Sequence, residues 1–321
     1  MSPDPASPLS VGLNAVILAV TEERPRILVV EGTGESAHAD TLPFGPLDPR
    51  GDRTLELTLR GWVRERTGLE LGYVEQLYTF GDRDRGFHRA TSGARVLSIA
   101  YLALVRETGT PEADNAQWKD VYDFLPWEDW RRGDPPLVRN TVVPALERWI
   151  RSADGAEAKR ERRLRAEITF GLGGSDWDSD RVLERYELLY GAGLVHEAVR
   201  DRGLPEPPDP ELPLGRAMAL DHRRMLATAL GRIRGKIRYR PVVFELLPPR
   251  FTLLQLQRVV EALAGMGTHK QNFRRLVERQ GLVEGTGSLE SRTGGRPAEL
   301  FRFRKEVLRE RRTPGVGLPG R

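Results

Sequence analysis

Residues 268–304 constrain the fold of this chain more than any other stretch. Thr268 and Gln271 stand three residues apart, the spacing of a capping box, so we expect a helix to begin there. Gly281 is a typical residue just beyond a helix end. A Gly-rich segment follows, and residues 301–304 then alternate Phe and Arg like one strand of a β-hairpin. A short helix followed by a basic hairpin is typical of a winged helix-turn-helix, which binds DNA.

The predicted helix is amphipathic, and its polar face is suited to DNA. Phe273, Leu276 and Val277 share the apolar face. Arg, Asn and Gln side chains on the other face can read base edges or hold phosphates, and the start of a helix favours a phosphate. A charged surface helix without a partner is the alternative interpretation. The candidate DNA-contacting residues of this stretch are Thr268, His269, Lys270, Gln271, Asn272, Arg274, Arg275 and, at the Gly-rich hairpin tip, Arg296.

Charge is distributed unevenly along the chain. Residues 216–312 contain 22 Lys and Arg against 9 Asp and Glu, whereas residues 1–215 contain 27 against 37. A basic C-terminal domain on an acidic N-terminal one is typical of a polyanion-binding protein with a separate second function. Lys236 and Arg238 lie in the basic part and are further candidates for phosphate contacts.

The composition excludes several other classes of protein. With 321 residues, two domains are expected, each large enough for its own core. The absence of cysteine excludes a disulfide framework and thiolate zinc sites. No apolar stretch approaches the roughly 20 residues that a membrane span requires, and the chain does not begin with a basic segment and an apolar run. We therefore expect a soluble cytoplasmic protein without a membrane partner.

The segments before the predicted recognition helix complete a DNA-binding domain. We expect a helix over residues 221–232 and a strand region with alternating basic residues over 235–248. Thr252 and Gln255 form a second capping box, which opens the support helix of the turn motif. Residues 265–267 contain two glycines and predict the turn before the recognition helix.

The N-terminal half predicts a sheet with one amphipathic helix. Residues 12–20 and 26–31 are two β-rich apolar runs joined by a polar turn, which predicts a hairpin. A helix is expected over residues 54–67, because its apolar positions have helical spacing and a glycine follows it. Residues 73–80 and 95–105 are further predicted strands.

This order of elements resembles the Nudix domain, and the blocks around it resemble the Nudix-related transcriptional regulators of NAD metabolism. The resemblance covers roughly residues 10–105 and 215–305. Residues 106–215 depart from it, because helical segments replace the short connection of the family. The blocks that carry the resemblance are YVEQLYTFGDRDR (73–85), KQNFRRLVERQGLVEG (270–285) and GGRPAELFRF (294–303).

The Nudix signature is degenerate in this chain. Its glutamates share one helix face, where they hold Mg²⁺ against a pyrophosphate. Aligned on residues 66–69, the Arg and first Glu of the signature fall on Gly61 and Trp62, and its Glu pair falls on Glu65 and Arg66. One glutamate flanked by two arginines is a poor site for a divalent cation. We therefore expect no hydrolysis, no catalytic residues and no metal site.

A pocket without its catalytic carboxylates can still bind a nucleotide. Arginine pairs with a diphosphate bidentately, and an aromatic side chain can stack on a ring. The resemblance implies an effector nucleotide such as NAD, ADP-ribose or ATP, with no cofactor required. A solvated helix face at Glu65 and Arg66 is the alternative. The candidate ligand-binding residues are Arg60, Glu65, Tyr78, Asp82, Arg85 and Arg95.

These features predict an α+β protein: a Nudix-like α/β/α sandwich with a helical insertion, followed by a winged helix-turn-helix domain. Residues 142–152 resemble the last helix of a Nudix fold. The expected segments are a disordered tail (1–10), a Nudix-like ligand-sensing domain (11–152), a helical insertion (153–203), a Pro-rich linker (204–214), a winged-helix DNA-binding domain (215–312) and a second disordered tail (313–321).

The resemblance implies a homodimeric repressor that binds a palindromic double-stranded DNA operator at genes of NAD biosynthesis or salvage and responds to the nucleotide. Two alternatives remain. One is a Nudix-type pyrophosphohydrolase of ADP-ribose or NAD with an atypical metal site, which would cleave them in the presence of Mg²⁺. The other is a nucleic-acid-binding module with no ligand, which a nucleotide would not stabilise against heat.

Overall fold

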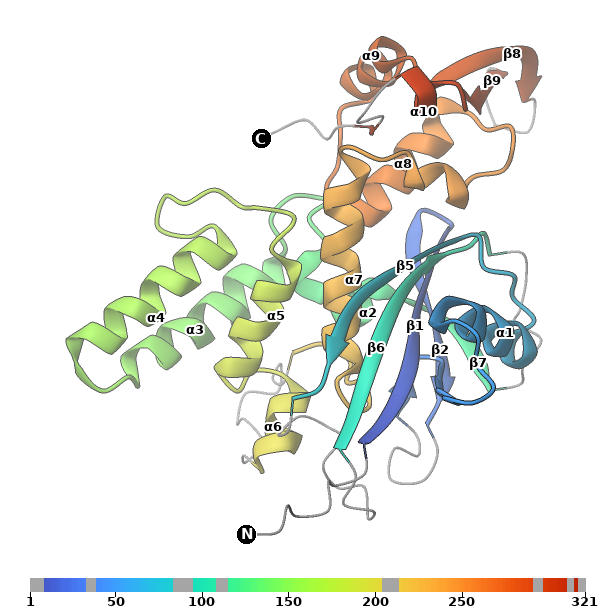
Figure 1. Ribbon diagram of the computed structural model, residues 1–321. Helices are drawn as coiled ribbons and strands as arrows, with labels where there is room; N and C mark the ends of the chain where they lie inside the picture. Colours follow the sequence, from blue (N-terminus) through green and yellow to red (C-terminus); the bar gives the residue numbers. More distant parts are fainter. Residues whose placement is uncertain are drawn as a thin grey trace.

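The computed structural model describes residues 9–32, 39–82, 95–107, 115–203, 214–290, 297–310 and 315–316. Figure 1 shows three parts: a sheet with one helix on its outer face, an arm of helices at the side, and a winged-helix unit above. Helix α7 (His222–Ile237) runs between the sheet and the arm and reaches the upper unit. The structure therefore has the predicted α+β class and order of parts.

A mixed β-sheet forms the centre of the lower unit. Among the described residues its order is β3-β2-β1-β6-β5, while β4 also pairs with β1 and β7 with β2. β1 and β2 form the predicted antiparallel hairpin, whereas β1 and β6 are parallel. The strands are β1 (Leu9–Thr21), β2 (Arg24–Glu31), β3 (Asp40–Thr41), β4 (Phe44–Pro46), β5 (Tyr73–Phe80), β6 (Arg95–Leu104) and β7 (Ala116–Asp120).

Successive side chains of β1 belong to two different cores, as the alternation of a strand requires. Leu13 and Ile17 pack in the core beneath α1 (Leu55–Thr67), whereas Val16 packs in the core beneath α7. The sheet thus has a helix on each face, which confirms the predicted α/β/α sandwich.

Helix α1 begins and ends where the sequence predicts. The hydroxyl of Thr54 accepts a hydrogen bond from the Leu57 N–H at 3.2 Å and caps the N-terminus. Gly68 ends the helix in the left-handed conformation, with φ of 70°, and its N–H donates to the Arg64 carbonyl at 2.9 Å.

The second face of the sandwich is covered by α7 rather than by residues 142–152. Residues 143–151 do form a helix, α3 (Val143–Arg151), but it packs mainly on the turn before it and on α4 (Gly155–Phe170). Helix α7 packs against β1, β5 and β6. The expectation that residues 142–152 complete the sandwich is therefore wrong, because the covering helix comes from beyond the Pro-rich segment.

The strand region expected over residues 235–248 is also wrong. Helix α7 continues to Ile237, and a 3-10 helix, η4 (Val242–Leu246), follows. The alternating pattern came from the last turn of one helix and a buried Val pair in the next. Pro241 lacks an N–H donor for a strand ladder, which favours the helical turn that it precedes.

The arm contains the helices of residues 153–203, where a helical insertion is expected, together with α3. Its α5 packs along α7, and α4 packs on both α3 and α5. Short helices lead into it from the end of β7. The remaining helices of this region are α2 (Val121–Phe124), the 3-10 helix η2 (Pro126–Glu128), the π-helical turn η3 (Val138–Val142), α5 (Val182–Gly191) and α6 (His196–Arg202).

The upper unit is a helix-turn-helix with a two-stranded wing. The capping box of Thr252 and Gln255 is present and opens the support helix, as predicted. The capping box expected at Thr268 is wrong, since the recognition helix has His269 as its N-cap and no side-chain cap bond. This unit consists of α8 (Leu253–Ala264), α9 (Lys270–Gln280), β8 (Val283–Glu290), β9 (Ala298–Phe303) and α10 (Val307–Glu310). No helix in the ranges described is both long and apolar enough to cross a membrane.

His222, the first residue of α7, ties that helix to the sheet from a fully buried position. Its Nδ1 accepts a hydrogen bond from the Leu42 N–H at 3.0 Å, and its Nε2 lies 3.1 Å from the side-chain amide nitrogen of Asn14. Burial lowers the pKa of His222 to about 3, and the positive charge of Arg200 acts in the same direction. The ring is therefore neutral at neutral pH.

We expect this histidine to make folding stability depend on pH between about 6.5 and 3. In that window the unfolded chain binds a proton at His222 and the folded chain does not, so stability falls as the pH falls. Between pH 7 and pH 5 the loss is about 2 kcal/mol from this group alone. Urea unfolding at both pH values should show this difference in the wild type and not in His222→Gln. Equal pH dependence in the two proteins would contradict the assignment.

Candidate nucleic-acid interface and ligand site

Helix α9 presents a basic face to solvent, as predicted. Phe273 and Val277 are buried and hold the helix on the unit, with Leu276 half-buried beside them. The side chain of Arg274 forms an ion pair with Glu278 at 2.7 Å. No carboxylate of the described residues pairs with Lys270 or Arg275. The exposed polar residues of this face are Lys270, Gln271, Asn272, Arg274, Arg275 and Arg279.

Thr268 holds the start of α9 in place through internal hydrogen bonds. Its N–H and its hydroxyl both donate to Glu261 Oε1 at 2.8 Å, and its carbonyl accepts from the Gln257 amide at 3.0 Å. Glu261 therefore takes the donors that a capping box or a phosphate would use. His269 is exposed at the N-cap, next to the unpaired N–H groups of the first turn.

The basic residues predicted at the end of α7 are bound to other parts of the protein. The Lys236 ammonium lies 2.6 Å from a Glu75 carboxylate oxygen and 2.7 Å from the Tyr73 hydroxyl on β5. Arg238 forms an ion pair with Asp180 at 3.2 Å. Both hold α7 in place, and their predicted phosphate contacts find no support in this geometry. Arg296, the predicted wing-tip contact, lies outside the described residues.

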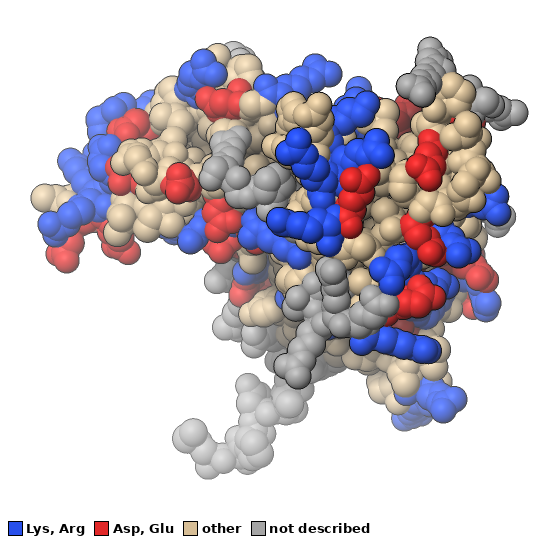
Figure 2. Space-filling view, turned by 90° about the horizontal axis from the view of Figure 1, so that it is seen from above, with Lys and Arg blue, Asp and Glu red and all other residues tan. Residues whose placement is uncertain are grey.

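The face that carries α9 and the wing is rich in positive charge. Figure 2 looks down on it and shows Lys and Arg side chains gathered across its middle, with fewer Asp and Glu among them. On β9, Arg302 is exposed and pairs with Glu284 of β8 at 2.6 Å. Such a surface attracts the phosphates of a nucleic acid.

A hollow of about 440 Å³ lies beside α1, between the helix and the loop before it. Glu65 and Arg66 of α1 line it together with Asp52 and Arg53 of the loop. The Arg66 guanidinium lies over the Trp62 ring, 5.8 Å from its centroid. Glu65, a predicted ligand residue, therefore lies at a hollow lined by charges of both signs.

The other predicted ligand residues do not join Glu65 at this hollow. Arg60 donates to the carbonyls of Leu71 and Gly72, the latter at 3.1 Å, and so fastens α1 to the start of β5. Tyr78 and Asp82 lie on the opposite face of the sheet, which α7 covers. Arg85 lies outside the described residues, and Arg95 is the first residue of β6, with its side chain outside them as well.

Tyr78 and Asp82 belong to the face that α7 covers. The exposed Tyr78 ring packs edge-on against Phe80, with 5.4 Å between ring centroids. The Arg224 guanidinium of α7 lies over Phe80 at 5.3 Å and forms an ion pair with Asp82. The sheet therefore separates these two residues from Glu65. Within the described ranges, no three His, Asp or Glu side chains are grouped so that they could hold a metal ion.

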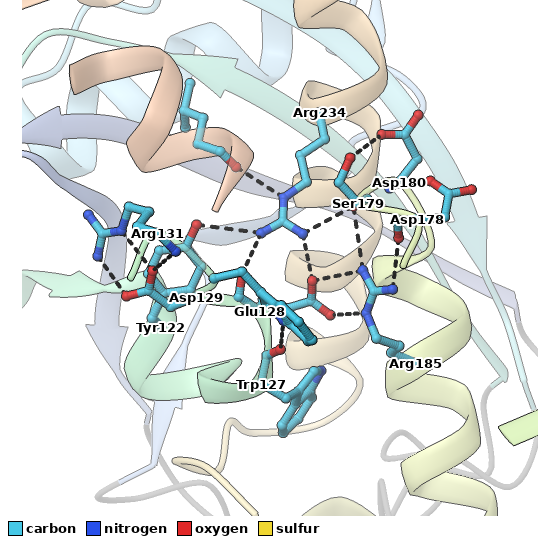
Figure 3. Close-up of polar contacts among 12 residues, drawn as sticks. Tyr122, Trp127, Glu128, Asp129, Arg131, Asp178, Ser179, Asp180, Arg185 and Arg234 are labelled. Carbon is cyan, nitrogen blue, oxygen red and sulfur yellow. Dashed lines mark hydrogen bonds and ion pairs between the residues drawn. The ribbon is translucent and has the colours of Figure 1, made fainter. Parts of the chain in front are cut away.

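A buried charge cluster that the sequence analysis did not predict is formed by Glu128, Arg185 and Arg234, and we call it the Glu128 cluster. Arg185 of α5 donates to both carboxylate oxygens of Glu128 at 2.6 and 2.9 Å, and Arg234 of α7 donates to one at 2.5 Å. All three side chains are at most 1% exposed. Figure 3 shows how they converge from η2, α5 and α7.

Further hydrogen bonds satisfy the remaining donors of the Glu128 cluster. Arg234 donates to the Ser179 carbonyl at 3.1 Å, and Arg185 donates to the Asp178 carbonyl at 2.8 Å. Burial acts to raise the pKa of Glu128, but the two arginines outweigh it and hold that pKa below its usual value. The carboxylate is therefore ionised, as a buried ion pair requires. The sequence signal that could have revealed the cluster is the position of Glu128 between Trp127 and Trp130, which indicates a carboxylate in an apolar environment that needs a basic partner.

The end of α8 and the turn that follows it are bound to Arg234 of this cluster and to residues near it. The Trp130 N–H donates to the Gly265 carbonyl at 2.7 Å, and the Tyr122 hydroxyl donates to the Ala262 carbonyl at 2.6 Å. Arg234 donates to the Leu263 carbonyl at 3.1 Å. The end of α8 is thus held by segments that follow β7 and by α7, which packs on the sheet.

The hairpin of the sheet also contacts the upper unit. Glu23, at the turn between β1 and β2, has a positive φ of 64° and pairs with Arg258 of α8 at 3.3 Å. Its carbonyl accepts a hydrogen bond from Arg131 at 2.5 Å. The sheet hairpin is therefore connected to α8 directly and, through Arg131, to the segment that follows η2.

Comparison with known proteins identifies the upper unit. Residues 243–303 match the model of the NrtR DNA-binding winged helix domain. A curated relative, the ADPR responsive transcriptional repressor NtrR of Acinetobacter baylyi (strain ATCC 33305 / BD413 / ADP1), is 40% identical over 86 residues. That match covers 27% of this chain and 34% of the relative, so the chain spans about a third of the length of the relative it matches.

Solved structures confirm the fold over nearly the whole chain. The crystal structure of Shewanella oneidensis NrtR complexed with a 27mer DNA matches with a TM-score of 0.54 and 19% identity, over 92% of this chain and 94% of that one. A MutT/nudix family protein from Enterococcus faecalis matches with a TM-score of 0.51 and 14% identity, over 95% and 89% of the two chains. The predicted resemblance, a Nudix-like domain followed by a winged helix, is confirmed.

Proposed function

We propose that this protein is a transcriptional repressor that binds double-stranded DNA through α9 and responds to a nucleotide bound in its Nudix-like domain. The observation that carries the proposal is the exposed basic face of α9 in a winged helix whose turn is fixed to the Nudix-like unit. The NrtR-type match over residues 243–303 supports the DNA-binding part. The name of the Acinetobacter relative supports ADP-ribose as the effector and repression as the outcome.

The proposed DNA contacts are the exposed side chains of α9 that no acidic side chain of the described residues neutralises. Arg275 and Lys270 have no acidic partner among the described residues and lie on the exposed face with Gln271 and Asn272. Amide side chains read adenine and arginine reads guanine in the major groove. A homodimer with two-fold symmetry would place two such helices on a palindromic operator, with half-sites about one helical turn apart.

The proposed effector site is the hollow beside α1. Arg53 and Arg66 would pair with the diphosphate of a NAD-related nucleotide, and Glu65 would accept hydrogen bonds from its hydroxyl groups. This assignment replaces the six-residue site expected from the sequence, of which only Glu65 lines the hollow. Control of NAD synthesis or salvage genes and action in the cytoplasm belong to the same proposal.

The proposed signal path runs through the Glu128 cluster. Its residues connect the segment after β7, the arm and α7 to the carbonyls that end α8. A nucleotide that favours one arrangement of these elements would shift the recognition helices by as much as its affinity for the two arrangements differs.

An enzyme is the alternative function, because Asp48, Asp52 and Glu65 line the same hollow. It predicts that the protein releases AMP from ADP-ribose in the presence of Mg²⁺. Chromatography of the nucleotides would detect the AMP. Arg53 and Arg66 line the hollow among these carboxylates and oppose the binding of a divalent cation. We therefore propose binding without hydrolysis.

Arg275→Ala tests the role of the recognition helix. If the side chain reaches a base, operator binding should weaken by about 1–3 kcal/mol, measured as the dissociation constant at fixed salt. Arg139→Ala is the matched control, because Arg139 is exposed on η3 in the arm and pairs with Asp134 there. Unchanged operator affinity of Arg275→Ala, or an equal loss in both variants, would remove Arg275 from the interface.

A further inference from the structure

A second hollow, of about 1010 Å³, lies between the Nudix-like sheet and the wing. Its walls come from both units. Tyr73 and Arg106 line it from the sheet, Phe303 and Lys305 line it from the wing, and the segment around η4 lies between them. It is a different place from the hollow beside α1, with which it shares no lining residue.

The hollow has an excess of positive charge. Arg106, Arg240 and Lys305 line it with exposed side chains, and none of them pairs with a carboxylate of the described residues. Its other two cations are already neutralised, Lys236 by Glu75 and Arg302 by Glu284. The excess charge favours an anion, and arginine holds a phosphate or carboxylate with two parallel hydrogen bonds.

Glu245 also lines the hollow and carries a negative charge. A Cβ on Gly72 would lie 3.2 Å from its carboxylate, so the side chain lies beside the start of β5. Three unpaired cations against one carboxylate leave the hollow positive. Glu245 would accept a hydrogen bond from a hydroxyl or amino group of the same ligand.

The hollow also has an aromatic wall. The Phe244 and Phe303 rings are stacked with 4.3 Å between centroids, and Phe251 lies 5.7 Å from Phe244. Phe244 and Phe303 are both half-buried, so part of each ring is accessible. A flat apolar group can pack on these rings, while the anionic group of the same molecule meets the arginines.

We propose that this interdomain hollow binds a small organic anion that carries a flat ring, with a nucleoside monophosphate as the simplest example. Arg106, Arg240 and Lys305 hold the anionic group, and the ring packs beside Phe244. A ligand here contacts the sheet and the wing at once. Its occupancy therefore depends on how the two units are placed, and it forms a second input to DNA binding beside the effector hollow at α1.

The test is calorimetric titration of AMP into the full-length chain, its Arg240→Ala/Lys305→Ala variant and an Arg139→Ala/Arg151→Ala control in the arm. Each lost charge-assisted hydrogen bond is worth about a factor of ten, so the first variant should weaken AMP binding by about tenfold or more. The control changes the net charge equally and should bind AMP within about twofold of the wild type. Inorganic phosphate should bind more weakly than AMP, because it lacks the ring.

Several outcomes would overturn the inference. One is AMP binding that is insensitive to Arg240→Ala/Lys305→Ala but is lost in Arg53→Ala/Arg66→Ala. That result would place the nucleotide at the hollow beside α1 and leave the proposed function intact. Another is a loss of DNA affinity without any loss of AMP affinity, which would make Arg240 and Lys305 contacts to the DNA backbone. Absence of AMP binding at millimolar concentration would also overturn it.

Discussion

Glu128→Gln should lower the free energy of unfolding by about 3–5 kcal/mol, because it leaves two buried guanidinium groups without their counter-charge. The substitution keeps the shape of the side chain and one carbonyl oxygen, so the effect isolates the charge. Glu128 is fully buried and accepts from both Arg185 and Arg234. Few surface substitutions in this chain would have an effect of this size.

Urea unfolding followed by tryptophan fluorescence measures this change, since Trp127 and Trp177 lie in the region. Glu278→Gln is the matched control. Glu278 pairs with Arg274 on the exposed face of α9, and such pairs contribute about 0.2–1 kcal/mol. A loss in Glu128→Gln as small as that of the control would show that the Glu128 cluster does not hold the units together.

Gly265→Ala should be comparably damaging, by about 3–5 kcal/mol, and should also weaken operator binding. Gly265 has φ of 66°, where a non-glycine residue costs about 1–2 kcal/mol. A Cβ there would lie 2.3 Å from the Glu128 carbonyl oxygen and 2.9 Å from the Tyr122 hydroxyl oxygen. The turn would have to move away from the Glu128 cluster, and α9 would move with it.

Gly281→Ala provides the comparison for this prediction. Gly281 has a similar φ of 58°, but a Cβ there meets only the end of the Arg304 side chain, at 3.1 Å. It should therefore cost only the backbone strain of about 1–2 kcal/mol. Thermal unfolding and operator titration of both variants measure the difference. Equal effects of the two substitutions would show that the contact between the turn and the cluster is unimportant.

Local sequence signals predicted the elements that are defined by a few neighbouring residues. The Thr54 cap and Gly68 fixed both ends of α1, and Gly281 fixed the end of α9. β5 has the predicted bounds, and β6 ends one residue before the predicted end at residue 105. The helix ends were predicted because capping bonds need no information from distant parts of the chain.

Interactions between distant segments could not be predicted from the same signals. The capping box at Thr268 failed because Glu261 in the preceding helix takes its N–H and hydroxyl. Helix α7 covers the sheet, although many helices separate it from β6 in sequence. The predicted ligand site placed Tyr78 with Glu65, but Tyr78 lies on the other face of the sheet. It follows a register shift in β5 that begins after Gln76.

The Glu128 cluster shows the same limit for charged residues. Nothing in the sequence relates a glutamate after β7 to arginines in α5 and α7, because the partners are brought together only by packing of the arm on the sandwich. The exposure of the candidate DNA-contacting residues on α9 was easier to predict. They lie within one helix, and their exposure follows from the apolar positions of Phe273 and Val277 on its other face.

The most direct test of the proposed function is an operator titration of the full-length chain with and without ADP-ribose at fixed salt concentration. The DNA should include the upstream region of its own gene and the promoters of NAD-synthesis genes, with an unrelated duplex as control. The predicted result is a specific complex whose dissociation constant changes when ADP-ribose is added. The change should be the same with and without Mg²⁺, because we propose that the nucleotide is bound and not cleaved. Equal affinity for operator and unrelated DNA, or a specific complex indifferent to the nucleotide, would contradict it.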